Sequence, residues 1–309
     1  MNSSNNNNRQ QQQRSIREAS HAGSWYTNDA TKLDKQLSGW LEQVVAPDAS
    51  LPPARAIISP HAGYSYSGPT AAFAFGNIDP KSIKRVFILG PSHHVYLQDC
   101  ALSQQTHYAT PIGDLPLDLQ VIEELHQTGS FSYMGKEEDE DEHSIEMQLP
   151  YIRKVFQGCD IKVVPVMVGS LSNKAEAEFG RIMAPYLAHP ENFFVISSDF
   201  CHWGKRFSYT FYDASKGDID ECIEWLDKEG MRIIETQDVQ AFHAYRNQYK
   251  NTICGRHPIG VFLNALKSCS VKFDLSFVRY AQSSRCKTKQ DSSVSYASAV
   301  LRESSASSS

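Results

Sequence analysis

Apolar residues recur along this chain with two different periods, and the periods alternate from one segment to the next. Leucine and valine repeat at helical spacing between positions 33 and 44, which predicts an amphipathic helix with Asn28 or Asp29 as its N-cap. Four other segments are short, continuous apolar runs, which are typical of strands buried on both faces of a sheet. The strands predicted from these runs are 56–59, 85–89, 161–168 and 193–197.

Helical and extended patterns continue to alternate through the rest of the chain. This alternation predicts a single α/β domain over residues 15–302, with a central, mostly parallel or mixed sheet and helices on both faces. The Asn/Gln-rich segment 1–14 and the segment 303–309 cannot bury a core and are predicted to be disordered tails. Further helices are expected at 68–75, 118–126, 144–156, 173–187, 218–235 and 258–267, and further strands at 273–280 and 294–300.

Composition narrows the class of protein. Hydrophobic residues make up 41% of the 309 positions, which is enough for a substantial core, and the net charge is -5. Because no basic block is present, the sequence does not predict a nucleic-acid surface. The N-terminus has no apolar run typical of a signal peptide, and the longest apolar run, Val163–Val168, is too short to span a bilayer. We therefore expect a cytoplasmic protein that can also enter the nucleus.

Three predicted strands run directly into histidines. His61 follows the strand at 56–59, His93 follows the strand at 85–89, and His202 follows the strand at 193–197. Ligands bind at the carboxyl ends of strands in open α/β sheets, so these imidazoles should meet at one edge. The sequence therefore predicts a metal-binding pocket there, although any one of these histidines alone could be a hydrogen-bonded structural residue.

Asp199 lies three positions before His202 and extends this candidate site. A carboxylate–imidazole pair suits general acid–base catalysis, or it can orient a metal ligand. The alternative is that Asp199 caps its own loop. Trp25 and Tyr66 lie near glycine-rich turns, where they could line the pocket or simply pack in the core.

Cys254 lies before a predicted helix, close to Arg256 and His257. The positive end of the helix and the guanidinium would both favour a thiolate, although a plain core cysteine is the alternative. The chain has seven cysteines but no Cys-x-x-Cys pair, which excludes a zinc ribbon and a thioredoxin-type motif.

The acidic run Glu137–Glu142 favours a solvated loop ahead of the next helix. No glycine-rich phosphate loop, dinucleotide fingerprint or nucleophile elbow is present, so nucleotide binding and serine hydrolysis have no support.

Segments that contain these residues resemble the Memo family, which is named for mediating cell motility. The resemblance covers residues 16–302. The matching segments are EASHAGSWY (18–26), SPHAGY (59–64), FILGPSHH (87–94), DEDEHSIEM (139–147), SDFCHWG (198–204), NTICGRHP (251–258), AQSS (281–284) and QDSSVSY (290–296).

The resemblance implies a fold like that of the class III extradiol dioxygenases, in which two histidines and a glutamate bind Fe(II) and another histidine is the acid–base catalyst. By the same resemblance, the metal ligands here are His61, His93 and Cys254, and His202 with Asp199 occupies the catalytic position. Trp25 and Tyr66 match positions that line the pocket or contact a peptide. A thiolate is softer than a carboxylate, which shifts the preference from Fe(II) toward Cu(I) or zinc and leaves a ligand that can itself be oxidised.

The residues and the resemblance together leave three hypotheses of function. The resemblance implies the one that we favour, a protein that binds iron or copper and acts in redox signalling, in control of reactive oxygen species, and downstream of receptor tyrosine kinases on cell motility and the cytoskeleton. The second hypothesis is a non-heme, metal-dependent dioxygenase-type enzyme. The third is an adaptor that binds signalling proteins, such as phosphotyrosine peptides of receptor kinases, in a vestigial active site.

Overall fold

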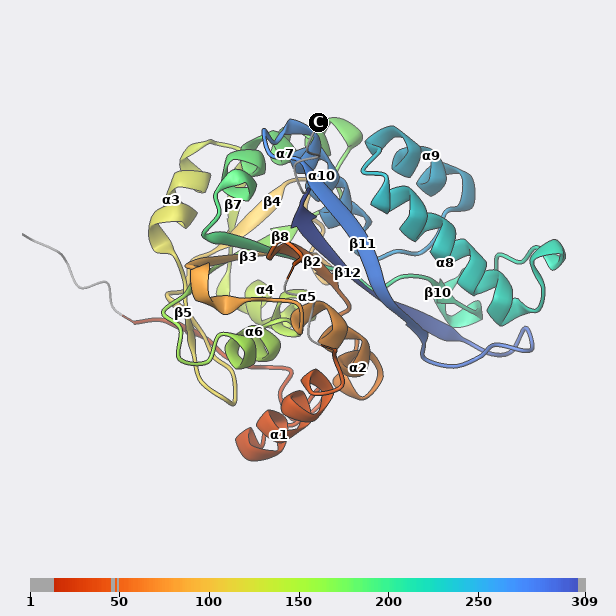
Figure 1. Cartoon of the computed structure of the whole chain (residues 1–309), viewed down its shortest axis with the longest axis horizontal. Helices are drawn as coiled ribbons and strands as arrows, with labels where there is room; N and C mark the ends of the chain where they lie inside the picture. The colour runs from red at the N-terminus through yellow and green to blue at the C-terminus, as the bar shows by residue number, and fades with distance from the viewer. Residues whose placement is uncertain (1–13, 46–47, 49, 305–309) are drawn as a thin grey trace, which may run out of the picture.

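The computed structural model describes residues 14–45, 48 and 50–304. The predicted tails at 1–14 and 303–309 lie outside this range except for Arg14, Glu303 and Ser304. Among the described residues, nine strands form one mixed sheet with helices on both sides (Figure 1). The α/β class predicted from the alternating pattern is therefore confirmed.

Four parallel strands form the middle of the sheet, in the order β2, β9, β3 and β8. Their residues are almost all buried, which explains why they appear in the sequence as continuous apolar runs. These strands are β2 (Ala54–Ser59), β9 (Asn192–Ser197), β3 (Arg85–Pro91) and β8 (Lys162–Val168).

Antiparallel pairs flank this parallel centre. On one side β12 pairs with β2, with the long strand β11 and with the short strand β10; on the other side β4 pairs with β8, and β7 then runs parallel to β4. A separate small sheet is formed by β1, β5 and β6. The bounds are β12 (Ser293–Glu303), β11 (Phe273–Gln282), β10 (His202–Trp203), β4 (Cys100–Ser103), β7 (Phe131–Met134), β1 (Ile16–Arg17), β5 (His107–Tyr108) and β6 (Leu115–Pro116).

Helices cover both faces of the sheet. In Figure 1, α1, α2, α5 and α6 lie below the strands, and α7 and α10 lie above them. The helices are α1 (Ala30–Leu41), α2 (Tyr64–Phe75), α3 (Leu119–Gln127), α4 (Lys136–Asp141), α5 (His143–Glu146), α6 (Leu149–Val155), α7 (Asn173–Ala188), α8 (Ile219–Glu235), α9 (Val239–Tyr249) and α10 (Arg256–Ser268).

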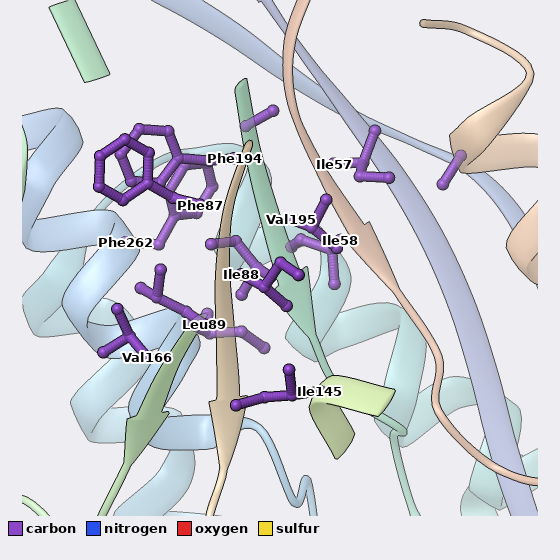
Figure 2. Close-up of a cluster of buried hydrophobic side chains, with 14 of the residues drawn as sticks. Ile57, Ile58, Phe87, Ile88, Leu89, Ile145, Val166, Phe194, Val195 and Phe262 are labelled. Carbon is purple, nitrogen blue, oxygen red and sulfur yellow. The ribbon is translucent and has the colours of Figure 1, made fainter. Parts of the chain in front are cut away.

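Side chains that alternate along the parallel strands fill the core on both faces (Figure 2). Phe87 and Phe194 stack with their ring centroids 4.6 Å apart, and Phe262 of α10 lies beside them. Ile88 and Val195 are the next residues in register, so they point to the opposite face. This rigid centre fixes where each strand ends, and therefore where the following loops begin.

Two predicted helices differ in extent from those observed. The helix predicted at 144–156 is two short helices: α5 ends at Glu146, and Pro150, which has no amide hydrogen to donate, lies in the first turn of α6. The helix predicted from Gly68 begins earlier, at Tyr64, and continues through Gly68. Glycine is required there because a Cβ would lie 2.4 Å from the ring of Trp40.

Among the described residues, no helix has both the length and the apolar character needed to cross a membrane.

Candidate metal centre

The loops after three parallel strands meet at one edge of the sheet, as the sequence predicted. His61 follows β2, His93 follows β3, and Asp199 and His202 follow β9. All four residues line an open cavity of about 660 Å³. Cys254, from the segment before α10, joins them: potential ligand atoms of His61, His93 and Cys254 all lie within 4.8 Å of one another.

The tautomer of His61 follows from the hydrogen bonds of Ser197. The single hydroxyl hydrogen of Ser197 is donated to the carbonyl of Ser144 at 2.7 Å. Its oxygen therefore accepts from Gln148 Nε2 at 2.9 Å and from His61 Nδ1 at 2.8 Å. With its hydrogen on Nδ1, neutral His61 has a lone pair on Nε2, the atom that can bind a metal ion.

His93 is oriented in the same way by a buried carboxylate. Its Nδ1 lies 2.8 Å from Glu142 Oε1, and its backbone N–H donates to Oε2 at 2.6 Å. Burial opposes ionisation of Glu142, but the hydrogen bond from His93, together with other nearby groups, lowers its pKa to about 2. A carboxylate behind a histidine ligand fixes the ring and increases its basicity, so Nε2 of His93 also faces the cavity with a free lone pair.

The acidic run that contains Glu142 is therefore not a solvated loop, and that prediction is wrong. Residues 136–141 form α4, and two acids of the run, Asp139 and Glu142, are buried. Asp139 accepts hydrogen bonds from Arg17 and Tyr108. The buried acids could not be distinguished from the exposed ones in the sequence, because six consecutive acidic residues give no periodic pattern.

Cys254 contacts His61 directly. Its Sγ lies 3.1 Å from His61 Nε2 and accepts the backbone N–H of Asp199 at 3.2 Å. Because Nε2 carries no hydrogen, the thiol hydrogen is donated to it. Burial, and then the charge of Asp199, raise the pKa of this thiol well above its usual range, so the predicted thiolate-favouring environment is wrong for the metal-free site. A cation must displace the thiol proton when it binds.

Glycine at position 255 allows Cys254 to approach the strand ends so closely. A Cβ at this position would lie 2.3 Å from Ser198 Cβ and 2.5 Å from the carbonyl oxygen of Ser197. The backbone N–H of Gly255 instead donates to Ser198 Oγ at 3.1 Å. The Cys-Gly pair therefore fixes the depth at which the thiol enters the site.

The predicted pair of Asp199 and His202 is not joined by a hydrogen bond in the described part of the chain. Asp199 Oδ1 accepts the backbone N–H of His61 at 2.8 Å, so the carboxylate caps the loop that follows β2. Burial raises the pKa of Asp199. His202 Nδ1 donates instead to the carbonyls of Phe200 at 2.9 Å and Thr252 at 3.1 Å. These bonds leave Nε2 of His202 as a hydrogen-bond acceptor.

His143 also lines the cavity, although it does not follow any predicted strand. Its ring stacks on His93 with centroids 4.4 Å apart, and the indole of Trp25 lies 4.3 Å away on a tilted plane. Burial, followed by the nearby His93, lowers the pKa of His143 to about 3, so its ring is neutral. His143 was difficult to identify from the sequence, because it follows a short acidic helix, α4, and not one of the apolar strands.

The two predicted aromatic residues lie at the rim of the cavity. Trp25 and Tyr66 both line it, with exposed fractions of 36% and 61%, so neither is part of the packed core. Arg206 supplies a positive charge to the same cavity. The cavity therefore combines an aromatic edge with a polar floor of imidazoles.

A second possible set of ligands is formed by His93, Glu142 and His143. Glu142 Oε1 already accepts from His93 Nδ1 and from the backbone N–H of Ser144, at 2.8 Å each, and Oε2 accepts from the backbone N–H of His93. A metal ion would have to compete with these bonds. In the set of His61, His93 and Cys254, an ion has to displace only the thiol hydrogen bond from Cys254 to His61 Nε2, so this set is the better fit.

Fold and site together define an α/β protein in which the ends of parallel strands carry a histidine–cysteine cluster able to hold one metal ion. The chain belongs to the Memo-like protein family, whose model matches residues 17–300. It is 56% identical over 294 residues to Protein MEMO1 of Xenopus laevis, a match that covers 93% of this chain and 98% of the relative. For Protein MEMO1 of Homo sapiens the identity is 54% over 290 residues, covering 92% and 97%.

A more distant relative is the Protein memo-1 homolog of Caenorhabditis elegans, which is 48% identical over 290 residues and covers 92% of this chain and 82% of the relative. Among solved structures, an uncharacterized protein of Escherichia coli K12 aligns with a TM-score of 0.48 and 11% identity, covering 79% of this chain and 99% of that one. At that level of similarity neither site residues nor activity can be transferred.

Proposed function

We propose that this protein binds one iron or copper ion through His61, His93 and Cys254 and acts as a redox-signalling protein. The observation that carries the proposal is the common orientation of the ligands. Both imidazoles hold their hydrogen on Nδ1 through buried acceptors, Ser197 and Glu142, so both Nε2 atoms present a lone pair to a cation, that of His61 once the thiol proton of Cys254 is displaced. Ligands fixed in this way lose little conformational entropy on binding.

The donor set also bears on the identity of the metal. Two imidazoles and a thiolate suit Cu(I) and zinc, and the imidazoles also suit iron. Bound iron or copper would supply one-electron redox chemistry, whereas zinc would hold the site without it. Because the thiolate is itself oxidisable, the site could respond to reactive oxygen species at the ligand as well as at the metal.

The cellular role in this proposal is the one that the family resemblance implies. The protein would act in the cytoplasm, and also in the nucleus, on signalling from receptor tyrosine kinases to cell motility and the cytoskeleton, and in the control of reactive oxygen species. Its partners would be signalling proteins, including phosphotyrosine peptides of receptor kinases.

Metal content tests the proposal. The protein is purified under anaerobic, reducing conditions, loaded with Fe(II), Cu(I) or Zn(II), and analysed by mass spectrometry. We expect about one equivalent of metal in the wild type and none in the His61→Ala/His93→Ala variant. The matched control is His126→Ala/His189→Ala, which removes two histidines outside the cavity and should retain the metal. A wild type that takes up no metal would overturn the proposal and leave the adaptor hypothesis.

Proton release is a second readout of the same site. Since Cys254 carries its proton in the metal-free protein, binding should release about one proton per metal ion in weakly buffered solution near neutral pH. Cys254→Ala should bind more weakly and release none from this position. Full proton release in Cys254→Ala would exclude the thiol as a ligand.

The position of His202 favours a second candidate function, an oxygen-dependent oxidoreductase. Its Nδ1 is engaged by two backbone carbonyls, so Nε2 can accept a proton from a substrate bound in the cavity. The test is oxygen uptake by the iron-loaded protein with phenolic substrates. His202→Ala should abolish uptake and keep its metal, whereas equal uptake by the two proteins would remove this candidate.

A further inference from the structure

A second cavity of about 290 Å³ lies where α9 ends and α10 begins. It does not include the metal ligands, but it shares the segment of residues 251–256 with the metal centre. Of the described residues that line it, three are cationic, two are amides, one is a hydroxyl, and none is acidic. They are Arg246, Asn247, Lys250, Asn251, Thr252 and Arg256.

The charges around this cavity do not balance. Arg246 Nη1 donates to Glu176 Oε1 at 2.7 Å, and Glu176 is fully buried, so this pair is neutral overall. Within residues 14–45, 48 and 50–304, Lys250 and Arg256 form no ion pair with any carboxylate. Two positive charges therefore remain at the cavity without a counter-charge.

The environment of Arg256 makes this imbalance costly. The Arg256 side chain is only partly exposed, so water solvates its charge less well than that of an exposed arginine. The guanidiniums of Arg246 and Arg256 line the same cavity and repel each other, and Glu176 pairs only with that of Arg246. An anion placed between them would turn that repulsion into attraction.

The helix dipoles do not determine whether this cavity attracts an anion or a cation. The N-terminal end of α10 at Arg256 is positive, but the C-terminal end of α9 at Lys250 is negative and lies at the same cavity. Asn251 and Thr252 have their donors engaged: Asn251 Nδ2 donates to Asp227 and Tyr245, and Thr252 Oγ1 donates to the carbonyl of His202. The charged side chains therefore dominate the recognition.

We propose that this cavity binds a doubly charged oxyanion of the phosphate type, either the free ion or a small phosphate monoester. The two unpaired cations match the two charges of the ligand, and the guanidinium of Arg256 can donate two parallel hydrogen bonds to its oxygens. The volume leaves room beside the phosphate for a small organic group. This site is independent of the metal proposed above.

The anion would also lie next to the metal cavity. Thr252 lines the anion site, and its hydroxyl and carbonyl hold the backbone and the ring of His202. Arg256 is two positions from Cys254. An anion bound here therefore contacts the segment that orients two residues of the other cavity.

Titration calorimetry with inorganic phosphate, glycerol phosphate, sulfate and chloride tests the proposal. We expect saturable binding of phosphate or its monoester, weakened at least about tenfold by Lys250→Asn and by Arg256→Gln. Asparagine suits position 250, whose φ of 51° is left-handed, so this variant should fold normally. Tighter binding of the monoester would identify an organic phosphate as the ligand, and equal or tighter binding of the inorganic ion would identify free phosphate.

Two controls make the test decisive. Lys267→Asn removes an exposed charge from the other end of α10 and should leave phosphate binding unchanged. The His61→Ala/His93→Ala variant should bind phosphate like the wild type, which separates this site from the metal centre. Absence of saturable phosphate binding at millimolar concentration, or equal binding by wild type and both cation variants, would overturn the proposal.

Discussion

Two clusters in this protein are built from the same residue types, histidine and glutamate, but use them differently. In the first cluster, Glu176 of α7 accepts from three side chains of α9 and α10. Its Oε1 accepts from Arg246 at 2.7 Å and from His257 Nδ1 at 2.7 Å, and its Oε2 accepts from His243 Nε2 at 2.8 Å. The carboxylate is saturated, so this cluster ties three helices together.

In the second cluster, at the candidate metal centre, the hydrogen bonds lie on the outer side of each ring. His61 and His93 bind Ser197 and Glu142 through Nδ1, which leaves both Nε2 atoms as acceptors on the inner side, where that of His61 takes only the thiol hydrogen of Cys254. The difference shows that the residue types alone do not identify a functional site. A functional site is identified by side chains held in fixed orientations, with their remaining lone pairs directed at one point.

We expect the largest effect on stability from removing Glu176, the carboxylate at the centre of the saturated cluster. Glu176→Ala should lower the free energy of unfolding by about 3–5 kcal/mol, because it leaves Arg246 partly buried without its counter-ion. The measurement is urea denaturation followed by circular dichroism. His61→Ala, at the open site, should cost only about 1 kcal/mol. If His61→Ala is as destabilising as Glu176→Ala, the distinction between the two clusters fails.

Acid should weaken the same saturated cluster. Burial opposes ionisation of Glu176, but its hydrogen bonds with His257 and Arg246 lower its pKa below the ordinary value of 4.5. A depressed pKa contributes stability above the unfolded value, and this contribution is lost as the pH falls through the folded value. The difference in unfolding free energy between wild type and Glu176→Gln should therefore shrink below pH 4.5. A difference that stays constant down to the acid transition would contradict this assignment.

At the open site, Glu142→Gln should weaken metal binding by about 10- to 100-fold, since a neutral amide supports the His93 ring less well than a carboxylate. The measurement is competition with a chelator of known affinity. Glu137→Gln makes the same charge change at an exposed position of the same acidic run and should have little effect. Similar losses in the two variants would mean that only the overall charge of the run matters.

Ser197→Ala should have the smallest of these effects, about a tenfold loss of metal affinity. Without this hydroxyl, His61 can place its hydrogen on Nε2, the tautomer that cannot bind a metal. Ser298→Ala removes another buried serine of the sheet, one that donates to the carbonyl of Thr70, and should keep the wild-type affinity. An unchanged affinity in Ser197→Ala would show that the tautomer is fixed by other contacts.

The central strands and the ends that carry His61 and His93 could be predicted, because strands buried on both faces leave continuous apolar runs and parallel strands end at one edge. The short strands β4, β7 and β10 were missed because they have two to four residues each, too few for a periodic pattern. Helix α9 was also missed, since only four of its eleven residues are buried.

The supporting residues of the site were less predictable than the ligands. The packing of α4 and α5 places Glu142 behind His93 and His143 at the cavity, and the sequence pattern does not encode this packing. Asp199 and His202 are close in sequence, but backbone groups compete for both: the amide of His61 takes the carboxylate, and two carbonyls take the imidazole. Local spacing could not reveal that competition.

The proposed ligands come from distant parts of the chain: Cys254 and His61 are separated by 193 positions. Such a contact forms only after the strands between them have assembled, so a partly folded chain has no site to offer a metal. Loading would therefore follow folding, and an ion that binds only the finished fold would shift the equilibrium away from the unfolded chain. Metal supply would then set the thermal stability, and with it the lifetime, of the protein in the cell.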